Sequence, residues 1–224
     1  MWLIDSSIGR KVIMSITGLF LILFLTFHSI MNVTVLFGTD IYNAICEFLG
    51  ANWYAVIGSL VLAAGFVVHI IYALYLTWLN FKARGSDRYA VTKSQKGVDW
   101  SSKNMLILGI IIFGFLALHL YQFWFKMQYA ELTGIRTGAY NPADGAAFII
   151  DLFSQPLFCI LYIVWLSALW FHLTHGVWSA FQSIGLNNKT WLPRLKCFAN
   201  VYSTIIILLF IAIPILFLFG YRPM

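Results

Sequence analysis

Five histidines lie within long apolar stretches of this sequence, and they are the side chains best suited to chemistry there. An ionisable residue at membrane depth is costly and usually serves a function. Neutral imidazole is also a common metal ligand. Two of the five, His172 and His175, lie three residues apart in ALWFHLTHGVWSAFQSIG, so they need not share one role. What each histidine can do depends on its depth in its own helix.

The composition identifies the elements that carry these histidines. Of 224 residues, 61% are hydrophobic and 10% are charged, and the mean hydropathy is +0.85. Soluble domains have about 25% charged residues. Only helices satisfy their backbone within a bilayer, so the sequence predicts an all-α membrane protein with a single domain over residues 1–224. Five blocks are near the roughly 20 residues that cross a ~30 Å core, at about residues 12–37, 53–79, 105–125, 152–181 and 201–220.

The basic residues predict the orientation. All but three of the 14 Lys and Arg residues fall in the tail and loops on one side, the three being Lys126, Arg136 and Arg222. Lys and Arg residues are enriched in the cytoplasmic loops of membrane proteins, so we expect a cytoplasmic N-terminus and an outer C-terminus. This sorting accounts for the net charge of +6 without a nucleic-acid partner. Three cysteines without a CxxC pair argue against a disulfide framework, and no cleavable signal is evident.

Helical rise places four histidines at two levels. At 1.5 Å per residue, His28 lies about 24 Å and His119 about 21 Å from the cytoplasmic face. His69 lies about 24 Å from the outer face. His172 reaches a similar inner depth if its helix starts near Pro156, which suits a first helical position. Two histidines from different helices therefore share an outer level, and two others share an inner level.

This arrangement favours ligation over isolated hydrogen bonds. A single histidine in a membrane helix can simply bond a neighbouring serine or carbonyl, but four matched by level point to a cofactor. Two facing imidazoles can take both axial positions of a haem iron. Levels separated by ~15 Å within a ~30 Å core suit electron transfer between two haems. Zinc is disfavoured because it prefers four ligands at one point. We therefore expect four of the five helices to form a haem-binding bundle.

The segment SSIGRKVIMSITGLFLILFLTFHSIMN resembles the cytochrome b membrane subunit of succinate:quinone oxidoreductases, the succinate dehydrogenases and fumarate reductases. The shared pattern is Gly-Arg-Lys, then Thr-Gly, then a histidine and an asparagine, although Met31 stands where glycine is common. The resemblance extends over nearly the whole chain and is greatest to the bacterial five-helix, di-haem type. It implies that His28 and His119 ligate the outer haem iron. It likewise implies that His69 and His172 ligate the inner haem iron.

The resemblance also bears on the pair His172 and His175. Family members carry a ligating histidine thirteen residues before a glycine that closes the fourth helix, and His172 stands at that interval from Gly185. His175 lies about 60° round the helix. It could bond a haem propionate, line a quinone pocket, face the cytoplasmic interface or replace His172 as the ligand.

The same resemblance implies the partners: an iron–sulphur subunit and an FAD-containing flavoprotein that interconverts succinate and fumarate. They would dock on the cytoplasmic face of the bacterial inner membrane. The chain has no dinucleotide fingerprint and no cysteine cluster for an iron–sulphur centre. It would therefore carry electrons between these subunits and a membrane quinone, rather than perform the dicarboxylate chemistry.

The expected quinone is menaquinone rather than ubiquinone, and its oxidation requires a base near the outer haem. Relatives that oxidise menaquinol use a glutamate near the start of the second helix, and Glu47 is the nearest candidate, although it lies closer to His69 in sequence than expected. Asp151 opens the fourth span and could cap it instead.

Two other classes remain open at this point. A di-haem b subunit of a hydrogenase or formate dehydrogenase would show the same matched histidines with different soluble partners. A transporter would use the histidines for protons or ions and would be colourless when pure.

Overall fold

The computed structural model describes residues 6–84, 99–182 and 184–224. Of the described residues, 83% are helical, and none of them lies in a strand. Five helical segments are long and apolar enough to cross a membrane, which confirms the predicted five-helix architecture. They are Ser7–Leu36, Trp53–Ala83, Met105–Thr133, Pro156–Gln182 and Trp191–Leu218.

The spanning segments are built from long helices, some of them continued by a short one. The first comprises α2 (Ser7–Val33) and the 3₁₀ turn η1 (Thr34–Leu36); the second is α4 (Trp53–Arg84); the third comprises α6 (Met105–His119), the π-helical η2 (Leu120–Tyr129) and α7 (Ala130–Thr133); the last two are α9 (Pro156–Gln182) and α10 (Trp191–Leu218). Three shorter helices lie at the ends of the bundle: α3 (Thr39–Leu49), α5 (Trp100–Lys103) and α8 (Gly145–Phe153).

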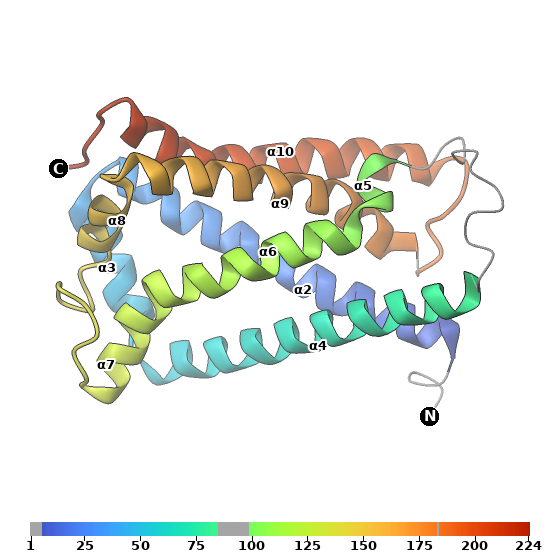
Figure 1. The fold of residues 1–224 in the computed structure, drawn as a ribbon, viewed down its shortest axis with the longest axis horizontal. Coiled ribbons are helices and arrows are strands. Elements are labelled where there is room, and N and C mark those ends of the chain that lie inside the picture. The colour runs from blue at the N-terminus through green and yellow to red at the C-terminus, as the bar shows by residue number, and fades with distance from the viewer. Residues whose placement is uncertain (1–5, 85–98, 183) are drawn as a thin grey trace.

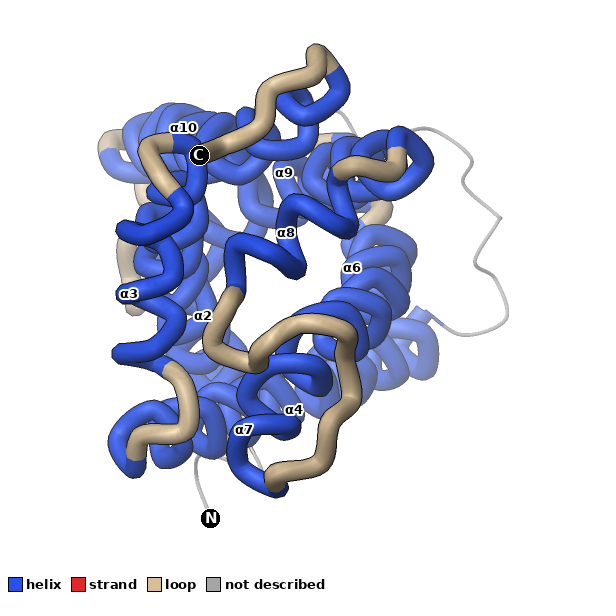
Figure 2. Tube along the Cα trace, turned by 90° about the vertical axis from the view of Figure 1, so that its left-hand side faces the viewer, coloured by secondary structure: helices blue, strands red, loops and turns tan. Residues whose placement is uncertain are grey.

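The long helices run along the longest axis of the molecule (Figure 1). Helix α2 packs against α4, α9 and α10, while α6 packs against α9. The start of α2 and the C-terminus lie at opposite ends, as five crossings require (Figure 1). Viewed from the end that carries the C-terminus, α3, α7 and α8 lie in front of the long helices (Figure 2). Helix α5 lies at the other end (Figure 1).

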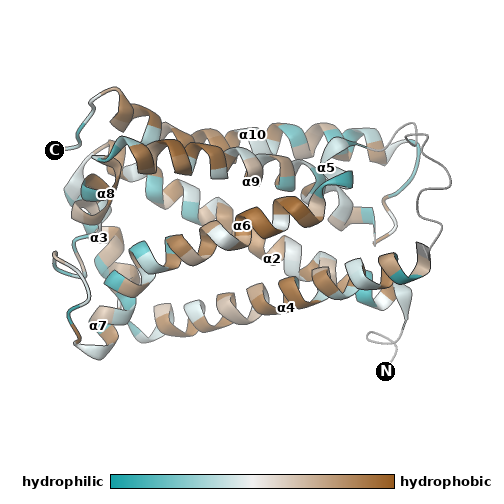
Figure 3. Ribbon diagram, viewed as in Figure 1, coloured by the Kyte–Doolittle hydropathy of each residue, from teal (hydrophilic) through white to brown (hydrophobic). Residues whose placement is uncertain are grey.

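The outer faces of the long helices are apolar. Figure 3 shows hydrophobic residues over the middle of the bundle and more hydrophilic ones toward its two ends. Large side chains such as Leu60, Ile107 and Leu208 are 67%, 58% and 59% exposed. An exposed apolar surface of this extent marks contact with a partner or membrane. The chain is therefore consistent with a multi-pass membrane protein.

Several helix boundaries differ from the sequence-based expectation. Helix α2 begins before residue 12 because the Ser6 hydroxyl accepts from the Gly9 amide at 2.9 Å and caps it. Helix α10 begins at Trp191, well before residue 201, because hydropathy marks only the apolar middle of a helix that extends into polar residues. Such boundaries are the part that hydropathy locates least well.

The fourth apolar block is divided between two helices. Leu152 belongs to α8, and α9 begins at Pro156. The Asp144 carboxylate caps α8 by accepting from the Ala147 amide at 3.1 Å. The expectation that Asp151 caps the fourth spanning helix is wrong, because Asp151 lies inside α8.

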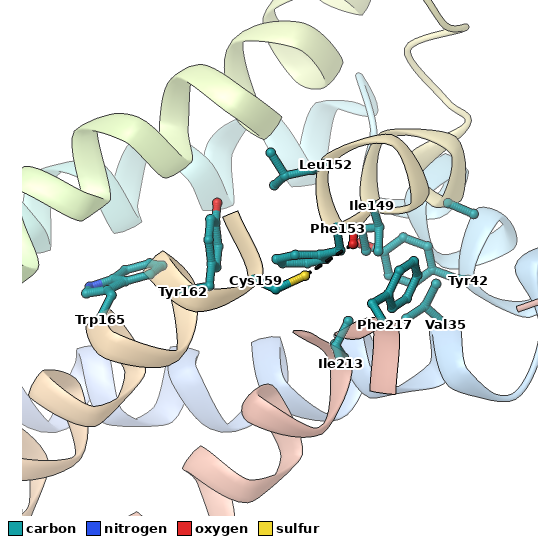
Figure 4. Packing of buried hydrophobic residues seen from close by; sticks show 11 residues of the cluster. Val35, Tyr42, Ile149, Leu152, Phe153, Cys159, Tyr162, Trp165, Ile213 and Phe217 are labelled. Atoms are coloured by element: carbon teal, nitrogen blue, oxygen red, sulfur yellow. Dashed lines mark hydrogen bonds between the residues drawn. The ribbon is translucent and has the colours of Figure 1, made fainter. Parts of the chain in front are cut away.

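A buried cluster closes the end of the bundle where α3 and α8 lie. Its aromatic and aliphatic side chains come from η1, α3, α8, α9 and α10 (Figure 4). The Cys159 thiol donates to the carbonyl oxygen of Phe153 at 3.1 Å and so joins α9 to the end of α8. Asn43 on α3 donates to the Asp144 carboxylate at 2.8 Å and accepts from the Ala146 amide at 2.9 Å. The short helices are thus fixed to the bundle by specific contacts.

Candidate functional site

The two histidines predicted at the outer level face each other. His28 lies on α2 and His119 is the last residue of α6. Their ring centres are 5.9 Å apart, and the ring planes are at 88° to each other. One residue of the first spanning segment and one of the third are thereby brought into one site.

Aromatic side chains surround this pair. Their ring centres lie 5.1 to 5.7 Å from one of the two imidazoles, and they are Phe24, Phe123, Trp165 and Phe210. Phe24 is stacked on His28 with an angle of 19° between the planes. The walls of the site are therefore flat, apolar and able to exclude water.

A series of polar side chains begins at His119 and includes a tyrosine on α9. The Nδ1 atom of His119 lies 3.4 Å from the Tyr162 hydroxyl. That hydroxyl donates to Oε1 of Gln122 at 2.6 Å. Gln122 lies in the π-helical segment that follows His119, and both Gln122 and Tyr162 are 6% exposed. π-helical turns are rare and frequently occur at functional sites.

The same π-helical segment is attached to its neighbours by a second glutamine. Oε1 of Gln128 accepts from the Ser59 hydroxyl on α4 at 2.8 Å. Its amide donates to the carbonyl oxygen of Gly50 at 3.1 Å. Gln128 therefore ties the third span to the start of the second.

His28 is held from the end of the bundle that carries α3. The Asn32 amide donates to the carbonyl oxygen of His28 at 2.7 Å and lies 3.2 Å from Nδ1 of the ring. Tyr42 on α3 donates its hydroxyl to Oδ1 of Asn32 at 3.2 Å. A short surface helix is thus connected to the histidine through one asparagine.

The other two predicted ligands lie on α4 and α9. His172 is within electrostatic reach of His69. Nδ1 of His69 lies 3.3 Å from the Thr17 hydroxyl on α2. A Cβ at Gly18 would lie 3.6 Å from the His69 ring, so the ring packs against α2 at this position. Thr17 precedes His28 by eleven residues, which separates the two levels by roughly 16 Å along α2.

His175 has different surroundings from His172. It lines a cavity of about 240 Å³ whose other walls include Asp99 and Lys196. These two residues form an ion pair at 2.8 Å. The Trp178 ring packs against the His175 ring edge to face, with centres 4.9 Å apart. Residues of α5, α9 and α10 therefore line the surroundings of His175, whereas His172 interacts electrostatically with His69 on α4.

The predicted quinol-site residue Glu47 lies in the last turns of α3, with its side chain exposed. Its carbonyl oxygen accepts from the Asn52 amide at 3.2 Å. In the described part of the chain, no hydrogen bond or ring contact joins Glu47 to His28 or His119. The proposed role of Glu47 as a base stays a prediction.

The sequence alone predicts no role for the polar residues behind the histidines. Thr17 and Asn32 stand within the segment that resembles the cytochrome b family, but their contacts were not predicted. Tyr162 and Gln122 are isolated polar residues within apolar spans. A search for such residues could have found them, because a buried polar group needs a partner.

The described residues contain no group of three or more His, Cys, Asp or Glu side chains that could hold a metal ion. An axial pair on a haem needs only two protein ligands.

No family model matches the chain, and no characterised protein or solved structure matches it. The case for a function therefore rests on the residues of this chain.

Proposed function

We propose that this chain is the di-haem cytochrome b membrane anchor of a bacterial succinate:quinone oxidoreductase. It carries electrons between menaquinone in the inner membrane and an iron–sulphur subunit, whose FAD-containing partner acts on the dicarboxylate. The observation that carries the proposal is the facing pair of His28 and His119 inside an apolar site.

The geometry of this pair fits an iron with two axial imidazoles. Imidazole nitrogens bind metals at about 2 Å, so two rings on opposite sides of one ion have centres roughly 6 Å apart. The separation of 5.9 Å between His28 and His119 agrees with this value. The surrounding flat rings suit contact with a macrocycle.

The second haem would be held by His69 and His172. Haem iron supplies reversible one-electron transfer when bound. The protein holds the ligands at two levels roughly 16 Å apart along α2, excludes water with aromatic walls, and spans the distance between the two membrane faces. Electrons from a quinol at the outer level could then reach partner subunits on the cytoplasmic side.

The end of the bundle that carries α5 and the start of α10 is the proposed cytoplasmic face. Its charged residues include Arg10, Lys82, Lys103, Arg194 and Lys196. Such a face suits docking of hydrophilic subunits, and anionic lipids are attracted by the same charges. The acidic residue Glu47 lies at the opposite end, where quinol oxidation would release protons.

An absorption spectrum and a pyridine haemochrome assay of the purified chain test this proposal. The expected result is two b-type haems per chain, bound non-covalently because no CxxCH attachment motif is present. One haem or none would refute the two-level arrangement, and a colourless protein would favour a transporter. Subunits that copurify distinguish a succinate:quinone oxidoreductase from a hydrogenase or formate dehydrogenase.

A further inference from the structure

One histidine at each level contacts a hydroxyl group through its Nδ1 atom. At the outer level, Nδ1 of His119 lies 3.4 Å from the Tyr162 hydroxyl. At the inner level, Nδ1 of His69 lies 3.3 Å from the Thr17 hydroxyl. The two hydroxyls come from different helices, α9 and α2, and serve different histidines. The same contact therefore occurs twice in unrelated parts of the fold.

Both hydroxyls already donate their proton elsewhere. The Thr17 hydroxyl donates to the carbonyl oxygen of Ile13 at 2.9 Å and lies 3.1 Å from that of Met14. The Tyr162 hydroxyl donates to Oε1 of Gln122 at 2.6 Å. A hydroxyl has one proton to donate and two lone pairs that accept. Toward the histidines, each oxygen can therefore act only as an acceptor.

This polarity determines which ring nitrogen carries the proton. Because the hydroxyl accepts, Nδ1 of His69 and of His119 must be the N–H donor. In a neutral imidazole with its proton on Nδ1, Nε2 has a free lone pair. Nε2 is then the nitrogen available to a metal. The hydrogen bond made by one ring nitrogen sets the role of the other in metal-binding histidines.

We propose that Thr17 and Tyr162 are positioning residues that fix the tautomer and ring orientation of His69 and His119, so that Nε2 is presented to the iron at each level. This inference rests on the proposed di-haem function. It adds two residues, and Gln122 behind one of them, to the four histidines that the sequence predicted. Each haem would then have one axial ligand with its tautomer set by a hydroxyl.

The two remaining histidines lack this constraint. Nδ1 of His172 is buried and has no hydrogen-bond partner among the described residues. The Asn32 amide nitrogen, which can only donate, lies 3.2 Å from Nδ1 and 3.5 Å from Nε2 of His28, so it offers no acceptor that would fix a proton on Nδ1. Each level therefore combines one histidine oriented by a hydroxyl with one that is not. Variants at Thr17 and Tyr162 should for this reason act on one level each.

The tautomer can be tested on the full chain in detergent, isolated without haem and labelled with ¹⁵N-histidine. Signals are assigned with His69→Gln and His119→Gln. In the unsubstituted chain, both residues should show a protonated Nδ1 and an unprotonated Nε2. Tyr162→Phe should convert the His119 signals to a mixture of tautomers and leave those of His69 unchanged. A protonated Nε2 in the unsubstituted chain, or no change in Tyr162→Phe, would overturn the proposal.

A matched pair at Thr17 separates the hydroxyl from its packing. Thr17→Val removes the hydroxyl at nearly constant shape and should give a mixture of His69 tautomers. Thr17→Ser keeps the hydroxyl and should preserve the signals of the unsubstituted chain. Equal spectra for the two variants would contradict the proposed role of Thr17. Because the two sites lie on different helices, misfolding of one variant leaves the other test intact.

Haem titration supplies the second readout. Loss of a partner behind a ligand typically lowers metal affinity 10–100-fold. The contacts of 3.3 and 3.4 Å are longer than a typical hydrogen bond, so we expect about a tenfold loss, with Thr17→Val acting on one haem and Tyr162→Phe on the other. Unchanged affinity and midpoint potential in both would refute the positioning role. A chain that binds no haem at all would instead refute the proposed function, while the ¹⁵N spectra would still decide the tautomers.

Discussion

Replacement of His172 by alanine should remove one of the two haems and leave the other. His172 and His175 are three residues apart, which is about 4.5 Å along the helix axis and about 60° around it. His172 is within reach of His69 on α4. His175 lines the cavity with Asp99 and Lys196. His175 therefore has different surroundings from His172, and we expect His172 rather than His175 to act together with His69.

The expected magnitude is a fall from two haems to one per chain in His172→Ala. The pyridine haemochrome assay measures the content, and the reduced spectrum should lose half of its low-spin b-type absorbance. His175→Ala serves as the matched control, because it removes the same group one turn away. It should retain two haems and at most move the potential of one, through a change in the surroundings of the ligand. Loss of the inner haem in His175→Ala, with its retention in His172→Ala, would refute the assignment.

Four further predictions concern the two histidine levels and the end of the bundle that carries α3. His28→Ala should remove the outer haem alone and His69→Ala the inner haem alone, as resolved by redox titration; selective loss of the opposite haem in either variant would show that the levels are assigned wrongly. Gly145→Ala should reduce the free energy of unfolding by about 1–3 kcal/mol and so lower the thermal midpoint, because a Cβ there would overlap the Cys46 thiol. A midpoint equal to that of the unsubstituted chain would contradict the packing. Burial raises the pKa of the Cys46 thiol from 9.0 to about 11, so at pH 8 the exposed Cys197 should react with an alkylating reagent much faster than Cys46, as measured by mass spectrometry of labelled peptides. The same shift implies that Cys46 contributes stability below pH 9 that is lost as the pH rises toward 11, by about 1.4 kcal/mol per pH unit at most; a Cys46→Ala variant should lack this component of the pH dependence, and an unchanged profile would show that the thiol is not its source.

The five spanning helices could be predicted because length and apolar composition suffice to define them. The levels of the histidines follow from helical rise alone, which is why His28 and His119 were expected near each other. Hydropathy does not register the division between α8 and α9, because both halves are apolar. Pro156 is the signal for it, since proline suits the first turn of a helix, and the start of the fourth spanning helix that Pro156 suggests from the sequence is where α9 begins.

The contacts behind the histidines could not be predicted for a different reason. Tyr162 and Gln122 are forty residues apart, and their hydrogen bond depends on how α9 packs beside the third span. The local sequence also gave no indication of π-helical turns after His119. Such turns depend on which side chains must reach partners on other helices. Residues that act through tertiary contacts are therefore harder to find than ligands placed by helical periodicity.

The π-helical segment Leu120–Tyr129 makes the third span intolerant of small changes in length. Each residue of a helix turns the chain, by about 100° in an α-helix, so deletion of one residue between His119 and Gln128 rotates everything beyond it relative to His119. An apolar span would still cross the membrane after such a deletion, and a hydropathy profile would hardly change. Gln128, however, would turn away from both Ser59 and the carbonyl of Gly50. Natural variation in this stretch should therefore consist of substitutions, with insertions and deletions confined to the loops beyond it.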